Sequence, residues 1–171
     1  MAESPLYHAI KKAFEDAGWA YAEVGEREVV RAGFEAHHTR VDLHVQAFEK
    51  LGAISVVSES SQSTTDPAKR ERLAELAMRV NQTLTVGNFE MDWEAGRLMF
   101  RASNLFSTPR GDISIIQGLI HNTIGEMDRI APLEAMVFQN DGPALAGLNF
   151  VQMMQRDDLL PPVETEESNG L

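Results

Sequence analysis

The sequence contains no cysteine among its 171 residues. This absence excludes disulfide bonds, thiolate zinc sites, iron–sulfur clusters and a cysteine nucleophile, and it is compatible with a reducing compartment. Long apolar runs are missing too, and the N-terminal residues have neither the basic region nor the apolar core of a signal peptide. We therefore expect a cytoplasmic protein without a membrane partner.

Positive charge is scarce. The chain has 15 Lys and Arg residues against 26 Asp and Glu residues, which gives a formal net charge of -11. An acidic surface repels phosphate backbones and anionic lipids unless a basic patch compensates, and the basic residues here are dispersed along the chain. We therefore expect no nucleic-acid partner. The length fits one domain with a core that needs neither a metal nor a disulfide.

The first half of the chain shows two kinds of hydrophobic periodicity. Apolar residues at helical spacing follow Ser4-Pro5 and end at Gly18, which predicts a helix over residues 5–17. From residue 29 the period changes to two, and this predicts three antiparallel strands near 29–34, 41–46 and 54–58. The polar run 58–65 is typical of a linker.

The second half predicts a helix, a hairpin and a long helix. Asp66-Pro67 caps and starts a helix that carries apolar residues to Leu84. Residues 89–93 and 98–102 alternate around a turn at Gly96, which predicts a β-hairpin. Asp112 begins a long helix whose periodicity continues beyond Pro132, so we expect a kink at this proline.

These segments suggest three parts. Residues 1–139 form one α+β domain, residues 140–160 form a C-terminal extension, and residues 161–171 form an acidic tail that is disordered by composition. The apolar stretch from Leu145 to Met154 could be an extra helix packed on the domain or a portable segment for a groove on a partner. Intramolecular packing is the preferred interpretation.

The element order α-β-β-β-α-β-β-α, with short links between strands, requires antiparallel pairing. We expect a two-layer α+β fold in which a five-stranded antiparallel sheet carries helices on one face and water on the other. The residues expected to face the helices are Val41, Leu43, Val45, Phe89, Met91, Leu98 and Phe100. The residues expected to face water are Asp42, His44, Gln46, Glu90, Asp92, Arg97 and Arg101.

The segments Val86-Gly87-Asn88-Phe89-Glu90-Met91-Asp92 and Gly96-Arg97-Leu98-Met99-Phe100-Arg101 resemble the signature hairpin of the YbjN family of bacterial proteins, also called sensory transduction regulators. The similarity covers roughly residues 5–139, and the cyanobacterial members look most similar. The resemblance implies a type III secretion chaperone-like fold, a tendency to form homodimers and no established catalytic residues. The chain from Gly142 onward departs from the family pattern.

Three constellations are candidates for a site. Phe48, Val57 and Met99 fall by parity on the water-facing side of the sheet and predict an apolar strip for a dimer contact or a protein partner. A second candidate is a metal site formed by His37, His38 and His44, but a turn with two histidines needs no metal. A third candidate is an acid/base pair of Glu90 and Asp92, but Arg97 and Arg101 on the partner strand can neutralise these carboxylates. We prefer the apolar strip to both.

The sequence therefore predicts a non-enzymatic, homodimeric, chaperone-like or regulatory protein that binds a protein partner and uses no cofactor or metal. Two alternatives stay open. One is a small-molecule sensor or enzyme with a pocket between the sheet and the helices, which would require polar groups that converge inside a cleft. The other is a structural subunit of a larger assembly.

Overall fold

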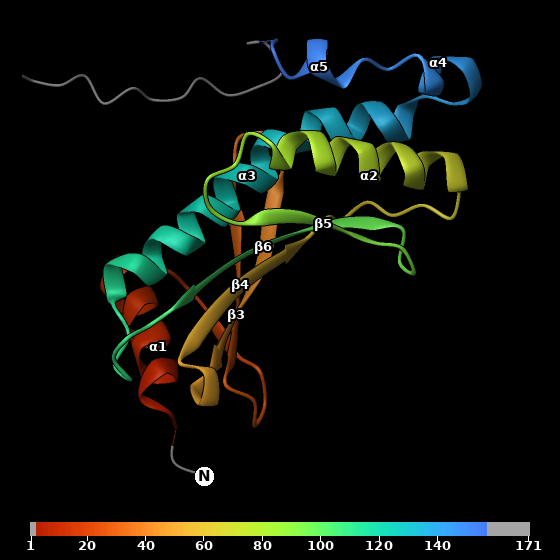
Figure 1. The fold of residues 1–171 in the computed structure, drawn as a ribbon. Helices are drawn as coiled ribbons and strands as arrows, with labels where there is room; N and C mark the ends of the chain where they lie inside the picture. The colour runs from red at the N-terminus through yellow and green to blue at the C-terminus, as the bar shows by residue number, and fades with distance from the viewer. Residues whose placement is uncertain (1–2, 157–171) are drawn as a thin grey trace, which may run out of the picture.

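An antiparallel six-stranded sheet carries three helices on one face in the computed structural model, which describes residues 3–156 (Figure 1). The strand order is β1-β2-β3-β4-β6-β5. The elements are α1 (Pro5–Ala17), β1 (Ala22–Glu23), β2 (Val29–Glu35), β3 (Arg40–Phe48), the 3-10 turn η1 (Glu49–Leu51), β4 (Ala53–Glu59), α2 (Pro67–Asn81), β5 (Asn88–Asp92), β6 (Arg97–Leu105), α3 (Ile113–Gln139), α4 (Gly142–Ala146) and α5 (Phe150–Met153). The predicted acidic tail, residues 161–171, lies outside the described residues.

The α+β class, the antiparallel pairing and the placement of the helices are confirmed, but the expectation of five strands was wrong. The sixth strand, β1, has only two residues, and it pairs Ala22 with Arg31 and Glu23 with Val30 at the outer edge of β2. Both residues of β1 are exposed. A strand this short has no alternation of buried and exposed positions, so the sequence pattern contains no signal for it.

The core lies between the sheet and the helices. Side chains of β3 alternate between buried and exposed positions along almost the whole strand, which is the pattern of a sheet with one wet face. Helix α1 packs on α3 and on β3, while α2 packs on β5 and β6. The largest completely buried side chains come from both layers and include Phe14, Phe100, Leu43, Leu73 and Ile120.

The predicted helix starts are confirmed by their caps. The hydroxyl oxygen of Ser4 accepts a hydrogen bond from the backbone N–H of Tyr7, and carboxylate oxygens of Asp66 and Asp112 accept bonds from the first turns of α2 and α3. Helix α3 continues through Pro132 to Gln139 and bends along its length (Figure 1). Because α3 is 27 residues long, it can reach across several strands as well as contact both other helices.

The hairpin of β5 and β6 depends on two glycines. Gly87 and Gly96 have φ angles of 78° and 66°, which side chains with a Cβ rarely adopt. A Cβ on Gly96 would lie 1.8 Å from the carbonyl oxygen of Thr64, and the N–H of Thr64 donates to the carbonyl of Gly96 at 2.9 Å. Gly96 therefore serves the tight turn and also lets the linker before α2 pack directly on the hairpin.

One side chain from α2 caps the outer edge of β5 at Phe89. The amide of Asn81 accepts a bond from the backbone N–H of Phe89 at 2.7 Å and donates to the carbonyl oxygen of Phe89 at 3.0 Å. These two bonds are those that a neighbouring strand would make. Because an unpaired edge invites association with another chain, Asn81 protects this side of the sheet.

Two buried carboxylates fasten α3 to loops on the other layer. Asp128 accepts hydrogen bonds from the backbone N–H groups of His38 and Thr39, and it holds the turn between β2 and β3. Glu134 accepts a bond of 2.8 Å from the hydroxyl of Ser60, which begins the linker between β4 and α2. Both contacts join segments that are far apart in the sequence.

Candidate functional site: the open face of the sheet

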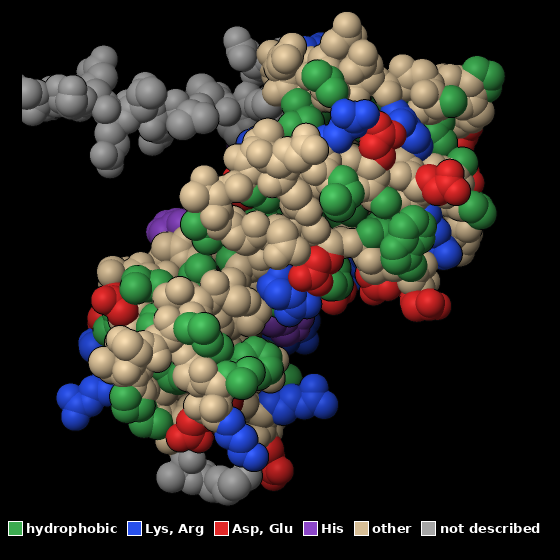
Figure 2. All heavy atoms as spheres, in the orientation of Figure 1, with side chains coloured by type: hydrophobic (Ala, Val, Ile, Leu, Met, Phe, Trp, Pro, Cys, Tyr) green, Lys and Arg blue, Asp and Glu red, His purple; other side chains and the backbone are tan. Residues whose placement is uncertain are grey.

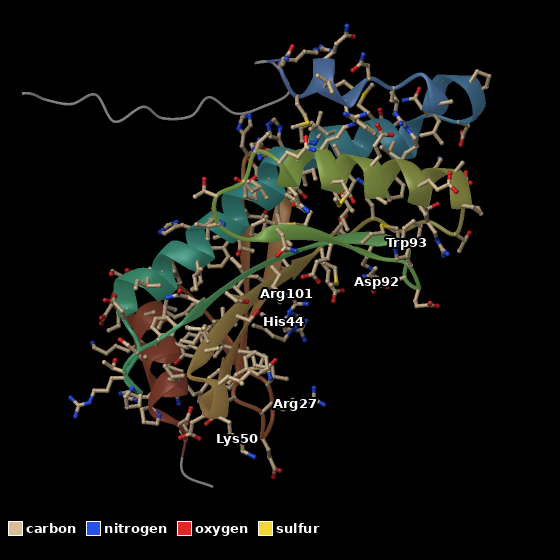
Figure 3. All side chains as sticks on the ribbon, viewed as in Figure 1. Arg27, His44, Lys50, Asp92, Trp93 and Arg101 are labelled. Carbon is tan, nitrogen blue, oxygen red and sulfur yellow. The ribbon has the colours of Figure 1, made fainter. Side chains whose placement is uncertain are left out.

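The face of the sheet opposite the helices is uncovered by any helix and carries an ordered set of side chains. Arg101, His44 and Arg27 lie on the side of the sheet away from α1 and α3 (Figure 3). The molecule is hollowed on this side, and basic and histidine side chains border the hollow (Figure 2). The register of the strands places the side chains of this face in rows that cross the sheet.

One row is apolar. Ala53 of β4 is paired with Phe48 of β3 on one side and with Leu105 of β6 on the other. Leu105 is 73% exposed, and Leu51 in the adjacent 3-10 turn is 70% exposed. These four residues, Phe48, Leu51, Ala53 and Leu105, are called the apolar end of the open face. Large exposed apolar side chains in adjacent positions are typical of a contact surface.

A second apolar position lies in the middle of the face. Val57 is paired with His44 and with Arg101, and Met99 lies two residues before Arg101 on the neighbouring strand. Val57 and Met99 are therefore diagonal neighbours, close enough for side chains to meet across the sheet. The row of Gln46, Ser55 and Ser103 separates this pair from the apolar end.

All three residues of the predicted strip therefore lie on the open face, but they do not form one continuous strip. Phe48 belongs to the apolar end, whereas Val57 and Met99 lie among charges. The sequence interpretation missed Leu51 and Leu105. The pairing of β4 with β6, which brings Leu105 beside Ala53, is between strands distant in sequence, and a local pattern could not reveal it.

The charges around Val57 and Met99 are largely paired. Arg101 donates two hydrogen bonds to the Glu90 carboxylate, at 2.8 and 3.1 Å, and these bonds lower the pKa of Glu90 below its usual range. A general acid needs a raised pKa, so this pair does not suit Glu90 for acid/base chemistry. The guanidinium of Arg97 is within 3.3 Å of the Glu59 carboxylate.

Arg31 and His44 form the unpaired part of the face. They are cross-strand neighbours in β2 and β3, and within residues 3–156 neither side chain makes a hydrogen bond or an ion pair. His37 and His38 stack edge to face at the turn between β2 and β3, with ring centroids 4.5 Å apart. In the described part of the chain no group of three His, Asp or Glu side chains is placed to hold a metal ion.

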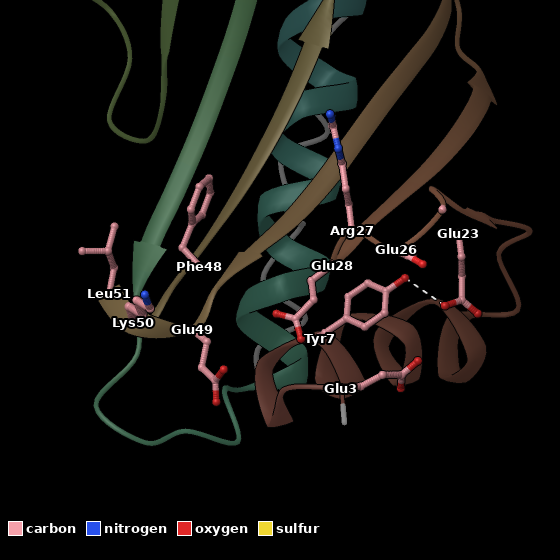
Figure 4. A pocket seen from close by; sticks show the side chains of 11 residues that line it. Glu3, Tyr7, Glu23, Glu26, Arg27, Glu28, Phe48, Glu49, Lys50 and Leu51 are labelled. Atoms are coloured by element: carbon pink, nitrogen blue, oxygen red, sulfur yellow. Dashed lines mark hydrogen bonds between the residues drawn. The ribbon is translucent and has the colours of Figure 1, made fainter. Parts of the chain in front are cut away.

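A cavity of about 810 Å³ adjoins the apolar end (Figure 4). It lies between the start of α1, the loop after β1 and the 3-10 turn, and its walls include the side chains of Tyr7, Phe48 and Leu51. The hydroxyl of Tyr7 donates to the Glu23 carboxylate at 2.9 Å. Burial and this bond to Glu23 raise the pKa of Tyr7. The phenol therefore stays protonated and acts as a hydrogen-bond donor.

The rim of this cavity is mostly acidic. The carboxylates at the rim are those of Glu3, Glu23, Glu26, Glu28 and Glu49, and the cations are Arg27 and Lys50. Glu28 accepts bonds from both the N–H and the hydroxyl of Ser4, at 2.6 and 2.8 Å, and Glu3 is bonded to Lys11 at 2.7 Å. The arrangement offers an apolar floor with charged edges.

Comparison with models of protein families shows the family to which the chain belongs. The model of the family described as "YbjN: Putative bacterial sensory transduction regulator" matches residues 7–114. The chain belongs to the YbjN family. The match includes the hairpin whose glycines are described above, so the predicted family is confirmed.

Among solved structures, this YbjN-family chain is similar to YbjN from E. coli, with a TM-score of 0.55 and 14% identity over 77% of this chain and 92% of that one. At this identity the likeness concerns the fold. Two other structures have lower TM-scores. The HopA1-SchA chaperone-effector complex has a TM-score of 0.47 and 11% identity over 73% of this chain and 92% of that one. The ExsC-ExsE complex has a TM-score of 0.49 and 10% identity over 74% of this chain and 91% of that one. No curated protein sequence matches the chain. No helix in the described range could cross a membrane.

Proposed function

We propose that this YbjN-family chain is a non-enzymatic, chaperone-like or regulatory domain that binds a protein segment on the open face of its sheet. The observation that carries the proposal is the apolar end of that face, where Phe48, Ala53 and Leu105 lie side by side next to a cavity with an apolar floor. Burial of exposed apolar area is the main source of affinity in protein association. The paired charges around Met99 would form the polar rim.

The proposed partner is a protein. The net charge of -11 acts against nucleic acids and anionic membranes, and the mostly acidic cavity rim favours a segment whose apolar side chains are flanked by Lys or Arg. We further propose that the domain acts as a homodimer in the cytoplasm, with Phe48, Val57 and Met99 as interface residues. A dimer through the open face would cover the exposed leucines, so the partner segment would bind there in place of the second copy.

A small-molecule sensor or enzyme is the second candidate, and the cavity of about 810 Å³ is the observation that favours it. This candidate requires a pocket between the sheet and the helices, and that layer is filled by apolar side chains. The buried Glu134 and Asp128 are bound to loops rather than grouped around a space. We therefore give the sensor the lower rank.

The dimer is tested by light scattering on purified protein with three variants. Met99→Asp and Leu105→Asp place a charge on the open face, and Val86→Asp, which changes an exposed apolar residue before β5, is the matched control. We expect the wild type and V86D to be dimers and both open-face variants to dissociate with unchanged circular dichroism. A dimer that persists in M99D and L105D would remove the open face from self-association.

The protein partner is tested by affinity capture with the same variants. We expect a stoichiometric protein to be recovered with the wild type and V86D, and to be lost with L105D. Recovery that is equal for all variants would place the partner on another surface. A small molecule that co-purifies reproducibly with the wild type, in the absence of any protein, would favour the sensor.

A further inference from the structure

The chain beyond α3 folds back over the helices. Helices α4 and α5 lie on the side of α2 and α3 that is turned away from the sheet (Figure 1). Three of their side chains, Leu145, Phe150 and Met153, are buried, and Phe150 is only 1% exposed. Residues 141–154, called the C-terminal strap, therefore cover an apolar surface of the helical layer.

Two long basic side chains of α2 hold the strap. The guanidinium of Arg72 lies over the ring of Phe150, 4.4 Å from its centroid, and Nη2 of Arg72 donates to the carbonyl oxygen of Leu148. One turn earlier, the ammonium of Lys69 donates to the carbonyl of Phe138 at 2.8 Å and lies 3.0 Å from the Asp141 carboxylate. Arg72 thus recognises an aromatic ring together with a carbonyl two residues before it, and Lys69 recognises an acidic residue.

The hold on the strap is limited. Helices α4 and α5 have five and four residues, far below the length at which a helix is stable alone, so they depend on their contacts with α2. The backbone hydrogen bonds of residues 141–156 stay within this segment and none joins the sheet. The strap is therefore attached through side chains, and its departure would expose Leu145, Phe150 and Met153 but leave the strand pairing of the sheet intact.

Arg72 is also imperfectly satisfied. Its Nε is buried and has no hydrogen-bond acceptor among residues 3–156. A buried donor without a partner destabilises the folded state, because no bond replaces the one that the donor makes with water in the unfolded chain. A different segment that offered an acceptor to Nε, as well as a ring and a carbonyl, would therefore bind this surface better than the strap does.

We propose that the outer surface of α2 around Lys69 and Arg72 is a second docking surface, which takes an acidic, aromatic-anchored peptide segment of a partner and which the C-terminal strap occupies in its absence. The ring of the anchor would lie under the guanidinium of Arg72, and the acidic residue would pair with Lys69. The strap competes with the partner, so it reduces the apparent affinity by the fraction of molecules in which it is closed.

The test uses the full chain and a fluorescein-labelled peptide of residues 140–156. In Phe150→Ala the strap loses its anchor, and we expect the peptide to bind this variant in trans at least about ten-fold more tightly than the wild type, because the surface is vacated. Adding Arg72→Leu to the variant should abolish binding, and a peptide with alanine at position 150 should not bind. The control, Val151→Ala, changes an exposed neighbour and should behave as the wild type.

The proposal is overturned if folded F150A, checked by circular dichroism, does not bind the peptide, or if R72L leaves the binding unchanged. Amide hydrogen exchange of the wild type gives an independent measurement should F150A fail to fold. We expect amides of α4 and α5 to exchange much faster than those of α3 near Ile130. Exchange of both at the rate of global unfolding would show that the strap does not open, and would also overturn the proposal.

Discussion

Replacing Glu134 by glutamine should reduce the change in the free energy of unfolding between about pH 5 and about pH 8. The Glu134 side chain is 4% exposed, and burial raises its pKa from the ordinary 4.5 to about 7, against a smaller opposing effect of the Ser60 hydroxyl. Oε1 is buried without a hydrogen-bond partner in the described part of the chain. The native state therefore prefers the protonated carboxyl.

The raised pKa of Glu134 makes the protein less stable as the pH rises. Because the pKa of Glu134 is higher in the folded than in the unfolded state, its contribution to the free energy of unfolding is fully present below the unfolded pKa of 4.5. This contribution is lost as the pH rises through the folded pKa of about 7. The difference between the two values, at about 1.4 kcal/mol for each pKa unit, corresponds to about 3 kcal/mol. This is a large part of the about 5–15 kcal/mol that stabilises a typical domain.

Urea unfolding followed by circular dichroism at about pH 5 and about pH 8 measures the effect. Between these conditions the wild type should lose about 2–3 kcal/mol more than Glu134→Gln, since the amide does not titrate. Glu94→Gln, which removes an exposed carboxylate, is the matched control. Equal losses for wild type and E134Q would refute the reasoning, because they would mean that the buried carboxyl does not titrate in this range.

Two further substitutions test the hairpin and the sheet edge. Gly96→Ala should lower the free energy of unfolding by more than about 1 kcal/mol, because Gly96 has a positive φ and lies against the Thr64 carbonyl. Gly118→Ala, in the second turn of α3 with open space around it, should raise the free energy of unfolding by up to about 1 kcal/mol. Thermal unfolding would measure both changes, and an unaffected G96A would contradict the account of the turn. Asn81→Leu removes both hydrogen bonds to the backbone of Phe89, so we expect the free energy of unfolding to fall by about 1–3 kcal/mol. We also expect this variant to associate with increasing concentration in size-exclusion chromatography, because the strand edge is exposed. A monodisperse N81L of native stability would show that the edge needs no cap.

Local patterns were sufficient for most of the fold. Alternation placed Val41, Leu43 and Val45 in the core and Asp42 and His44 on the open face, because a strand with one wet face has a strict period of two. Cap chemistry located the starts of α1, α2 and α3. Strand β1 could not be predicted, since two exposed residues beside a longer strand show no period.

The site was predictable only in part. Parity placed Phe48, Val57 and Met99 on the correct face, but whether they are neighbours depends on the register between strands. That register arises from the pairing of β4 with β6, which no turn connects. The attachment of the strap through Arg72 was equally hidden, because the ring of Phe150 is 78 positions away along the chain (150 − 72) and local periodicity does not report such contacts.

The strand order has a consequence for how the protein is made. Strand β6 lies between β4 and β5, yet it is the last strand to leave the ribosome, after residue 105. The 46 residues between the ends of β4 and β6 (105 − 59) take several seconds to synthesise at about 5–20 residues per second. During this time the nascent chain exposes the edge of β4, with Ile54 and Val56, to which β6 later pairs. A chaperone that protects newly made chains would therefore act in this interval, before β6 pairs with β4.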